Sequence, residues 1–231
     1  MSGHGSRTLY PFHHGQRQDK VKLDAAVAHS VAARAAESRD VNARFFQMNS
    51  AQLVAAAKAM ADEWRDGGRL FAMGSGGSNC DAARITAEFL HPGITGRPSL
   101  PAFDLGSAAA TISAIGEDIG SDQIFARQIV VLAKYGDGLI GFSARGDPVN
   151  LIAAYTAAKE RGLITIGFTG GDEGRIKTRG QVDHCLVVES SSVHRVRDCH
   201  VAACHILSDL IHSLLADVRA PAARRADANR R

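Results

Sequence analysis

Leu70–Asp81, with the sequence LFAMGSGGSNCD, is the stretch that decides the fold of this chain. It begins with four apolar residues, which predict a short strand buried on both faces. The glycines that follow let the backbone approach a ligand closely, and the serines and Asn79 add hydrogen-bonding groups. A helix that opens at about 79–81 directs its free N–H groups and the positive end of its dipole at this turn. The stretch therefore predicts an anion-binding loop, or a tight turn between strand and helix, which also uses Gly and Ser.

Beyond this stretch, strands and helices are predicted to alternate along the chain. Apolar runs predict four further strands, at about 102–105, 138–142, 163–168 and 185–188. Helical patterns lie at about 79–90, 107–115, 121–133, 148–161 and 193–215. Such alternation predicts a parallel sheet with helices on both faces, whose ligands bind beyond the carboxyl ends of the strands. Gly/Ser/Thr-rich loops follow the strands that end at about Met73, Phe142 and Phe168, so a ligand site is expected there.

Both ends of the chain differ from this central region. From about Leu23 to Arg65, apolar residues recur at helical spacing, and a break near 38–40 or 49–50 would give two helices, with Ser50 as an N-cap. Residues 1–20 are expected to form a flexible leader. Residues 219–231 carry five arginines and are expected to form a basic disordered tail. This leaves a single domain over residues 21–218.

Composition excludes some function classes. The 231 residues are 45% hydrophobic and carry a formal net charge of +3, which the arginine-rich tail explains, so nucleic-acid binding is not expected. The sequence predicts no signal peptide and no membrane span. Its four cysteines show no Cys-x-x-Cys spacing and are expected to be reduced thiols. Together these features predict a cytoplasmic protein.

Several motifs resemble those of the sugar isomerase (SIS) domain and, within it, the phosphoheptose isomerase family. Residues 74–82 resemble the family's Gly-Asn-Gly-Gly-Ser loop, and residues 125–128 its Phe-x-Arg-Gln helix. Residues 116–118 stand near its Asn-Asp-Phe-Gly turn. Residues 143–147 occupy its Ser-x-Ser-Gly-x-Ser phosphate loop, and residues 169–174 resemble its Thr-Gly-x-x-Gly-Gly turn. The resemblance covers about residues 22–215.

The resemblance implies a fold, an assembly and an activity. The fold is a flavodoxin-like α/β sheet of five parallel strands in three layers, and the assembly is a homotetramer with sites at subunit interfaces. The activity is aldose–ketose isomerisation of sedoheptulose 7-phosphate through an enediol, by a glutamate and a histidine. Carried over by position, these catalytic residues are Glu88 and His205. The expected substrate-binding residues are Ser75, Gly76, Gly77, Ser78, Arg84, Asp118, Ser143, Arg145, Thr169 and Arg197.

The chemistry of isomerisation suits such a pair, because it moves a proton between adjacent carbons and needs a base at carbon and an acid for the sugar oxygens. A carboxylate and an imidazole do both when burial brings their pKa values near neutrality. Each residue also has an alternative role. Glu88 could instead form an ion pair with Arg84, one helical turn earlier, and His205 lies on an apolar helix where a histidine is often a core residue.

The chain departs from the family's zinc-binding pattern. Members of the family often carry zinc, and two of the four expected ligand positions hold Arg84 and Arg197 here, in place of a histidine and a glutamine. Because a guanidinium stays protonated, it does not ligate zinc in proteins. We therefore expect no metal and no other cofactor at this position.

The phosphate loop departs as well. Ser143 is kept, but Arg145 and Pro148 replace two serines. One hypothesis is that the three arginines at 84, 145 and 197 rebuild the site for an anionic ligand without metal. The alternative is that they pair with Asp147, Glu88 and Asp198, so that the site is closed.

Two alternatives to an isomerase remain open at this point. A non-catalytic SIS module that binds a sugar phosphate or a protein, of the replication-initiator-associating type, is one of them, and a regulatory sugar-phosphate sensor is the other. The presence of Glu88 favours the enzyme.

Overall fold

The computed structural model describes residues 20–146, 148–171, 180 and 182–228. The chain divides into two units, residues 1–39 and 40–231, and each is described by itself. Of the leader predicted over residues 1–20, all but Lys20, the first residue of helix α2, lies outside the described residues.

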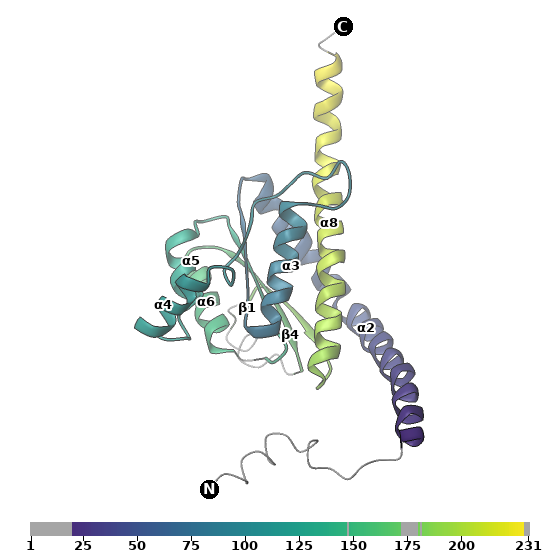
Figure 1. Cartoon of the computed structure of the whole chain (residues 1–231). Coiled ribbons are helices and arrows are strands. Elements are labelled where there is room, and N and C mark those ends of the chain that lie inside the picture. Colours follow the sequence, from purple (N-terminus) through teal and green to yellow (C-terminus); the bar gives the residue numbers. More distant parts are fainter. Residues whose placement is uncertain (1–19, 147, 172–179, 181, 229–231) are drawn as a thin grey trace. The chain divides into compact units, whose positions relative to one another are not determined.

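A five-stranded parallel sheet forms the centre of the second unit (Figure 1). Its strands are β1 (Leu70–Gly74), β2 (Ala102–Asp104), β3 (Gly138–Ser143), β4 (Ile164–Gly170) and β5 (His184–Val188). They lie in the order β2-β1-β3-β4-β5, which is the flavodoxin-like order that the resemblance implies. All five begin and end within two residues of their predicted positions.

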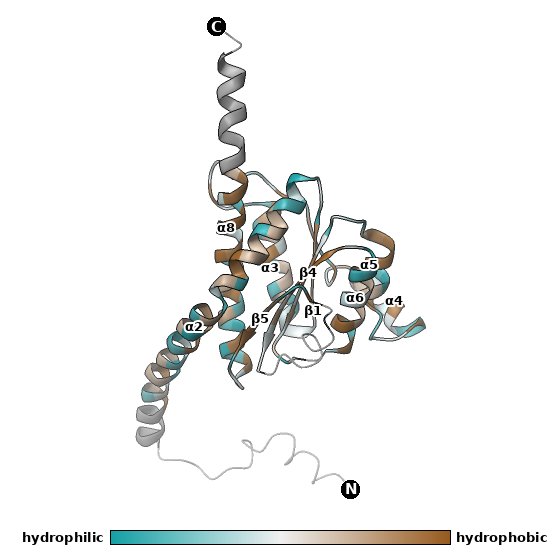
Figure 2. Ribbon diagram, turned by 180° about the vertical axis from the view of Figure 1, so that it is seen from behind, coloured by the Kyte–Doolittle hydropathy of each residue, from teal (hydrophilic) through white to brown (hydrophobic). Residues whose placement is uncertain are grey.

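Helices cover both faces of the sheet and complete the three predicted layers. They are α3 (Asn79–Leu90), α4 (Ala109–Asp118), α5 (Ala126–Leu132), α6 (Val149–Glu160) and α8 (Val193–Ala228), with α2 (Lys20–Arg65) before the first strand. Along β1, Leu70 and Ala72 join a core cluster with α2, α3 and α8. Phe71 and Met73 join the other cluster, with α5 and α6. This alternation follows from the two-residue period of a strand, and Figure 2 shows hydrophobic residues along β4 and β5.

Helix α2 is continuous, so the predicted break into two helices is wrong. The side chain of Asn49 explains why residues 49–50 do not end a helix. Its Nδ2 donates to the carbonyl oxygens of Phe45 and Val187, at 2.9 and 3.1 Å, and its Oδ1 accepts from the N–H of Val187, at 3.1 Å. Asn49 therefore stays within the helix and binds Val187 at the free edge of β5, and Ser50 caps no new helix.

Two further boundaries differ from prediction. Helix α4 continues through the predicted turn at 116–118 and ends where Gly120 adopts a φ of +134°, so α5 begins only at Ala126. Helix α8 continues to Ala228, past the end predicted at about residue 215, and the expected disorder of residues 219–231 stays a prediction. Five alanines among residues 219–228 favour a helical backbone there, against the cost of Pro221.

The carboxyl ends of the strands gather the loops singled out by sequence. Gly74 of β1 pairs with Phe142 of β3, and Ser143 pairs with Thr169 of β4, so the three loops begin at one edge of the sheet. The segment Val193–Ala216 that follows β5 is long and apolar enough to cross a bilayer by length and composition alone. Half of it is buried within the protein, as in the core helix of a soluble fold, so the segment is weak evidence for a membrane span.

Candidate active site

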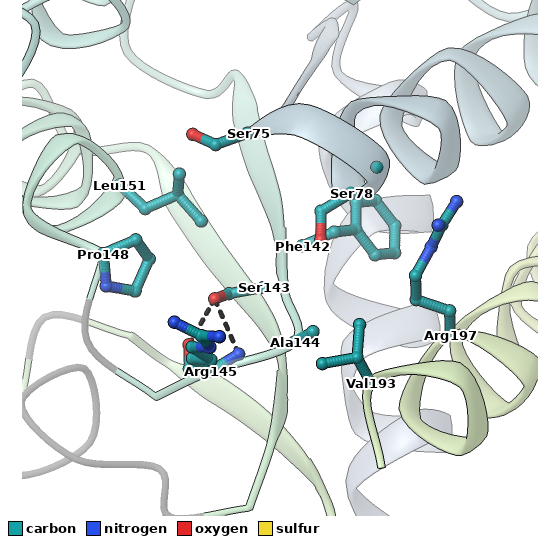
Figure 3. A pocket seen from close by; sticks show the side chains of 11 residues that line it. Ser75, Ser78, Phe142, Ser143, Ala144, Arg145, Pro148, Leu151, Val193 and Arg197 are labelled. Carbon is teal, nitrogen blue, oxygen red and sulfur yellow. Dashed lines mark hydrogen bonds between the residues drawn. The ribbon is translucent and has the colours of Figure 1, made fainter. Parts of the chain in front are cut away.

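A cavity of about 370 Å³ lies at this edge of the sheet (Figure 3). We call it the loop pocket. It brings together six of the residues predicted to bind substrate: Ser75, Gly77, Ser78, Ser143, Arg145 and Arg197. The remaining lining residues are mostly apolar: Phe142, Ala144, Pro148, Leu151 and Val193. The sequence thus predicted most of the polar lining of this cavity.

The glycine-rich turn offers backbone donors to the loop pocket. Gly76 has a φ of +57°, a conformation that glycine adopts without a steric cost, and a short 3₁₀ turn over Gly76–Ser78 leads into α3. The first N–H groups of such a turn have no partner within it and are available to an anion. Ser75 is held from the other side, because Asn150 Nδ2 donates to its Oγ at 2.7 Å. Its hydroxyl hydrogen stays available to a ligand.

The loop after β3 uses its serine differently. The Oγ of Ser143 accepts from the N–H of Arg145 at 3.1 Å and donates to the carbonyl oxygen of the same residue. The hydroxyl therefore shapes the loop and is not free for a ligand. The side chain of Arg145 is exposed and lines the cavity. Asp147, the partner that the closed-site alternative gives to this arginine, lies outside the described residues.

Arg197 is paired with Asp81 and not with Asp198. Its Nε lies 3.9 Å from Asp81 Oδ2, on the first turn of α3. Asp198 instead lies 3.4 Å from Arg195. The closed-site alternative is thus wrong for Arg197, which keeps its place in the lining of the loop pocket.

Glu88 and His205, the predicted catalytic pair, are in direct contact. Glu88 Oε1 lies 2.6 Å from His205 Nδ1, and both side chains line a second cavity, of about 260 Å³. The imidazole is 54% exposed and the carboxylate 23% exposed, so the pair is open to a ligand. Burial raises the pKa of Glu88, and the charge of Asp209 raises it further, against the lowering effect of His205 and Arg84. A raised pKa makes this carboxylate a stronger base than an exposed one.

The loop pocket and the Glu88–His205 cavity lie at different positions along helices α3 and α8. Helices α3 and α8 lie side by side, in parallel, because Asp81 meets Arg197 near their N-terminal ends and Glu88 meets His205 further on (Figure 1). Eight residues separate the two positions on α8 and seven on α3, which at 1.5 Å per residue is about 10 to 12 Å. The two cavities share no lining residue.

Comparison with known proteins decides the family. The SIS domain family matches residues 35–170. The phosphoheptose isomerase of Roseiflexus sp. is 35% identical over 178 residues, which are 77% of this chain and 89% of that protein. The solved phosphoheptose isomerase of Neisseria gonorrhoeae is 31% identical, with a TM-score of 0.75, over 81% of this chain and 99% of that one. That of Francisella tularensis is 28% identical, with a TM-score of 0.77, over 81% and 98%.

The chain belongs to the phosphoheptose isomerase family of SIS-domain proteins. This confirms the resemblance found in its motifs. The fold that the family implied is the one described above.

The residues do not fit the zinc that members of this family often carry. Of the four expected ligand positions, only Glu88 and His205 hold groups that bind zinc, and the Nδ1 of the histidine already faces the carboxylate. Across the part of the chain that the structure describes, no three His, Cys, Asp or Glu side chains come together as a metal would need. The absence of zinc stays a prediction, and no step below depends on a metal.

Four predicted site residues line neither cavity: Gly76, which shapes the turn described above, and Arg84, Asp118 and Thr169. Arg84 is exposed on α3 and acts on Glu88 through its charge. Asp118 is exposed at the end of α4, and Thr169 is fully buried at the end of β4. Their roles in this family member stay predictions.

Sequence reasoning missed two buried residues behind the loop pocket. Asp81 is 1% exposed, and His200 is fully buried with its Nδ1 3.8 Å from Asp81 Oδ2. The position of an acidic residue directly after a glycine-rich loop was the available signal. Its basic partners lie more than 100 residues away in sequence, so the signal was incomplete without the fold.

Proposed function

We propose that the protein is an aldose–ketose isomerase of a phosphorylated sugar, sedoheptulose 7-phosphate, and that Glu88 and His205 transfer its protons. The family to which the chain belongs is one of sugar-phosphate isomerases. The observation that carries the proposal is the 2.6 Å contact between Glu88 Oε1 and His205 Nδ1 in an open cavity. A carboxylate and an imidazole at this distance form the acid–base pair that isomerisation requires.

In this proposal the two side chains divide the chemistry. The Glu88 carboxylate removes a proton from the carbon beside the carbonyl, and His205 gives a proton to the carbonyl oxygen, so that an enediol forms. The imidazole then takes the proton of the neighbouring hydroxyl, and Glu88 returns its proton to the adjacent carbon. No net charge is gained, and the raised pKa of Glu88 supports both its basic and its acidic step.

We propose that the complete site forms between two copies of the chain. The loop pocket holds the groups suited to a phosphate, and the Glu88–His205 cavity holds those suited to proton transfer. Because these cavities are separate in one chain, a second copy that brings its Glu88–His205 pair to the loop pocket supplies the missing half. This supports the homo-oligomer, a tetramer, that the resemblance implies.

We also propose that the reaction needs no zinc, because Arg84 and Arg197 stand at two ligand positions. Metal analysis of the purified protein should find no stoichiometric zinc, and a chelator should leave the activity unchanged. Loss of activity in the chelator, restored by zinc alone, would contradict this.

Heavy water provides the test of the main proposal. The protein is incubated with sedoheptulose 7-phosphate in D₂O, and NMR follows deuterium entering the carbons next to the carbonyl. We expect exchange with the wild type and with Glu160→Gln, an exposed position on α6, but not with Glu88→Gln. If the wild type catalyses no exchange at any protein concentration, the enzyme is excluded and the non-catalytic binding module takes its place.

A further inference from the structure

The guanidinium of Arg197 lies against the glycine-rich turn. A Cβ built on Gly77 would stand 2.6 Å from Nη1 of Arg197 and 2.9 Å from its Cζ. Gly77 is not among the glycines with positive φ, whereas Gly76 is, and a Cβ on Gly76 would meet nothing within 4 Å. The two neighbouring glycines are therefore needed for different reasons. Gly76 allows the backbone turn, and Gly77 leaves room for the arginine.

A buried carboxylate lies close to this arginine, within ion-pair distance but without a hydrogen bond to it. Asp81 Oδ2 is 3.9 Å from Arg197 Nε and 3.8 Å from His200 Nδ1. The ring of His200 lies 5.8 Å, between centroids, from both Phe142 and Phe168, which anchors the cluster to the sheet. Arg197 lines the loop pocket, and Figure 3 shows its side chain rising beside Phe142 and Ser78. Because Nε is the atom nearest to Asp81, the two Nη groups are left for a ligand.

Two arginines give the lining of the loop pocket its positive charge. Arg145 and Arg197 stand on opposite sides of it in Figure 3. Among the hydroxyls, that of Ser143 is engaged with its own loop. A guanidinium presents a planar fork of donors that matches phosphate oxygens, and such charge-assisted hydrogen bonds are about twice as strong as neutral ones. The pocket is therefore suited to a doubly charged phosphate monoester.

We propose that Arg197 is the residue that determines specificity for phosphate in the loop pocket, and that Asp81 is its positioning residue. The free Nη groups bind the phosphate as a dianion, Asp81 holds the guanidinium in place, and Gly77 provides the space. This deepens the proposed function by naming how its substrate's charged group is selected. The proposal depends on that function only for the identity of the sugar, and not for the binding of phosphate.

Calorimetric titration with inorganic phosphate tests the role of Arg197 at fixed pH and ionic strength. We expect Arg197→Gln to raise the dissociation constant about 10- to 100-fold, the range of a lost charge-assisted hydrogen bond. Arg197→Lys should recover little of this, because an ammonium has neither the fork nor the Nε that faces Asp81. A dissociation constant for Arg197→Gln within twofold of the wild type overturns the proposal, as does a wild type that binds no phosphate.

The space at Gly77 gives an independent test. Gly77→Ala should weaken phosphate binding about as much as Arg197→Gln, and the double variant should be no worse than either one, because both changes remove the same interaction. Gly93→Ala is the matched control, since a Cβ there meets nothing within 4 Å. Losses that add in the double variant would mean that Gly77 serves the backbone alone, and would overturn the assignment of its space to Arg197.

Asp81→Asn tests the positioning role. It should weaken phosphate binding in the wild-type background and have no effect in the Arg197→Gln background, whereas a purely structural role would weaken binding in both. Glu88→Gln separates this proposal from the isomerase, because it should bind phosphate as the wild type does. If no isomerisation is found but these variants behave as expected, the proposed function fails and the phosphate site stands.

Discussion

The two ends of the α3–α8 helix pair offer different polar groups to a ligand. Near the start of α3, the backbone N–H groups of the glycine-rich turn and the guanidinium of Arg197 present positive charge. Nine residues after Asn79, the Glu88 carboxylate meets His205. One scaffold thus separates the group that would bind a phosphate from the group that would move a proton.

The difference follows from the electrostatics of a helix. The N-terminal end of α3 attracts anions such as a phosphate. Glu88 lies in the last turn of α3, where the dipole no longer favours its ionised form and burial raises its pKa. Each proposed function therefore lies at the end of α3 that supports it.

Substitutions at one end of the helix pair at a time test whether binding and proton transfer are separate. We expect His205→Asn to lower kcat by about 10²- to 10⁴-fold with little change in KM, since it removes an acid–base group. Arg197→Gln should instead raise KM and leave kcat nearly unchanged, since it removes binding energy. Steady-state kinetics at saturating and limiting sugar phosphate measure both. The division between the ends is wrong if either variant changes kcat and KM together.

A smaller gain of activity is expected when a chain with a defective catalytic pair and a chain with a defective loop pocket form mixed oligomers. Chains with Glu88→Gln and chains with Arg145→Ala and Arg197→Gln are co-expressed under different tags and purified as mixed oligomers. If a site joins the loop pocket of one copy to the Glu88–His205 pair of another, some sites in the mixture are intact. Activity at limiting substrate should then exceed the mean of the two pure variants.

Co-expression of each variant with wild-type chains is the control for this mixture. If the mixture of the two variants has only the mean activity of the two pure variants, each complete site lies within a single chain.

The fold could be predicted from sequence because its signals are local. Short, largely apolar runs predicted the strands, and all five were found. Gly/Ser/Thr-rich loops after three of them predicted the edge of the sheet at which the loop pocket lies. The continuity of α2 could not be predicted. Asn49 on its own favours a helix break, and the residue that binds its side chain, Val187, lies 138 residues away in sequence. Long-range partners of this kind override local propensity.

The site was predictable to the same extent. Motif resemblance placed Glu88 and His205, and the structure puts them in contact. It could not reveal that Arg197 pairs with Asp81, because the nearest acidic residue in sequence is Asp198 and only the parallel packing of α3 and α8 brings Asp81 closer. Charged neighbours in sequence lie on different faces of a helix, so adjacency is a poor guide to pairing.

The smallest expected effect concerns the pH dependence of the Glu88–His205 end. Burial is the main cause of the raised pKa of Glu88, and the negative charge of Asp209, one turn after His205 on α8, raises it further, while His205 and Arg84 lower it. Asp209→Asn removes one of the raising causes and leaves Arg97, its partner at 2.6 Å, without a counter-charge. Both changes favour the ionised carboxylate. The acidic limb of kcat/KM, which reports ionisation of the base, should therefore move to lower pH.

The control for this shift is Asp122→Asn, which neutralises an exposed carboxylate away from the catalytic pair. Profiles of all three proteins are measured at constant ionic strength, because screening weakens the effect of an exposed charge. A limb that moves to higher pH, or that moves equally in the control, would mean that a group other than Glu88 sets it. In that case the loop pocket would keep its proposed role in binding, and the catalytic base would be a residue outside the Glu88–His205 cavity.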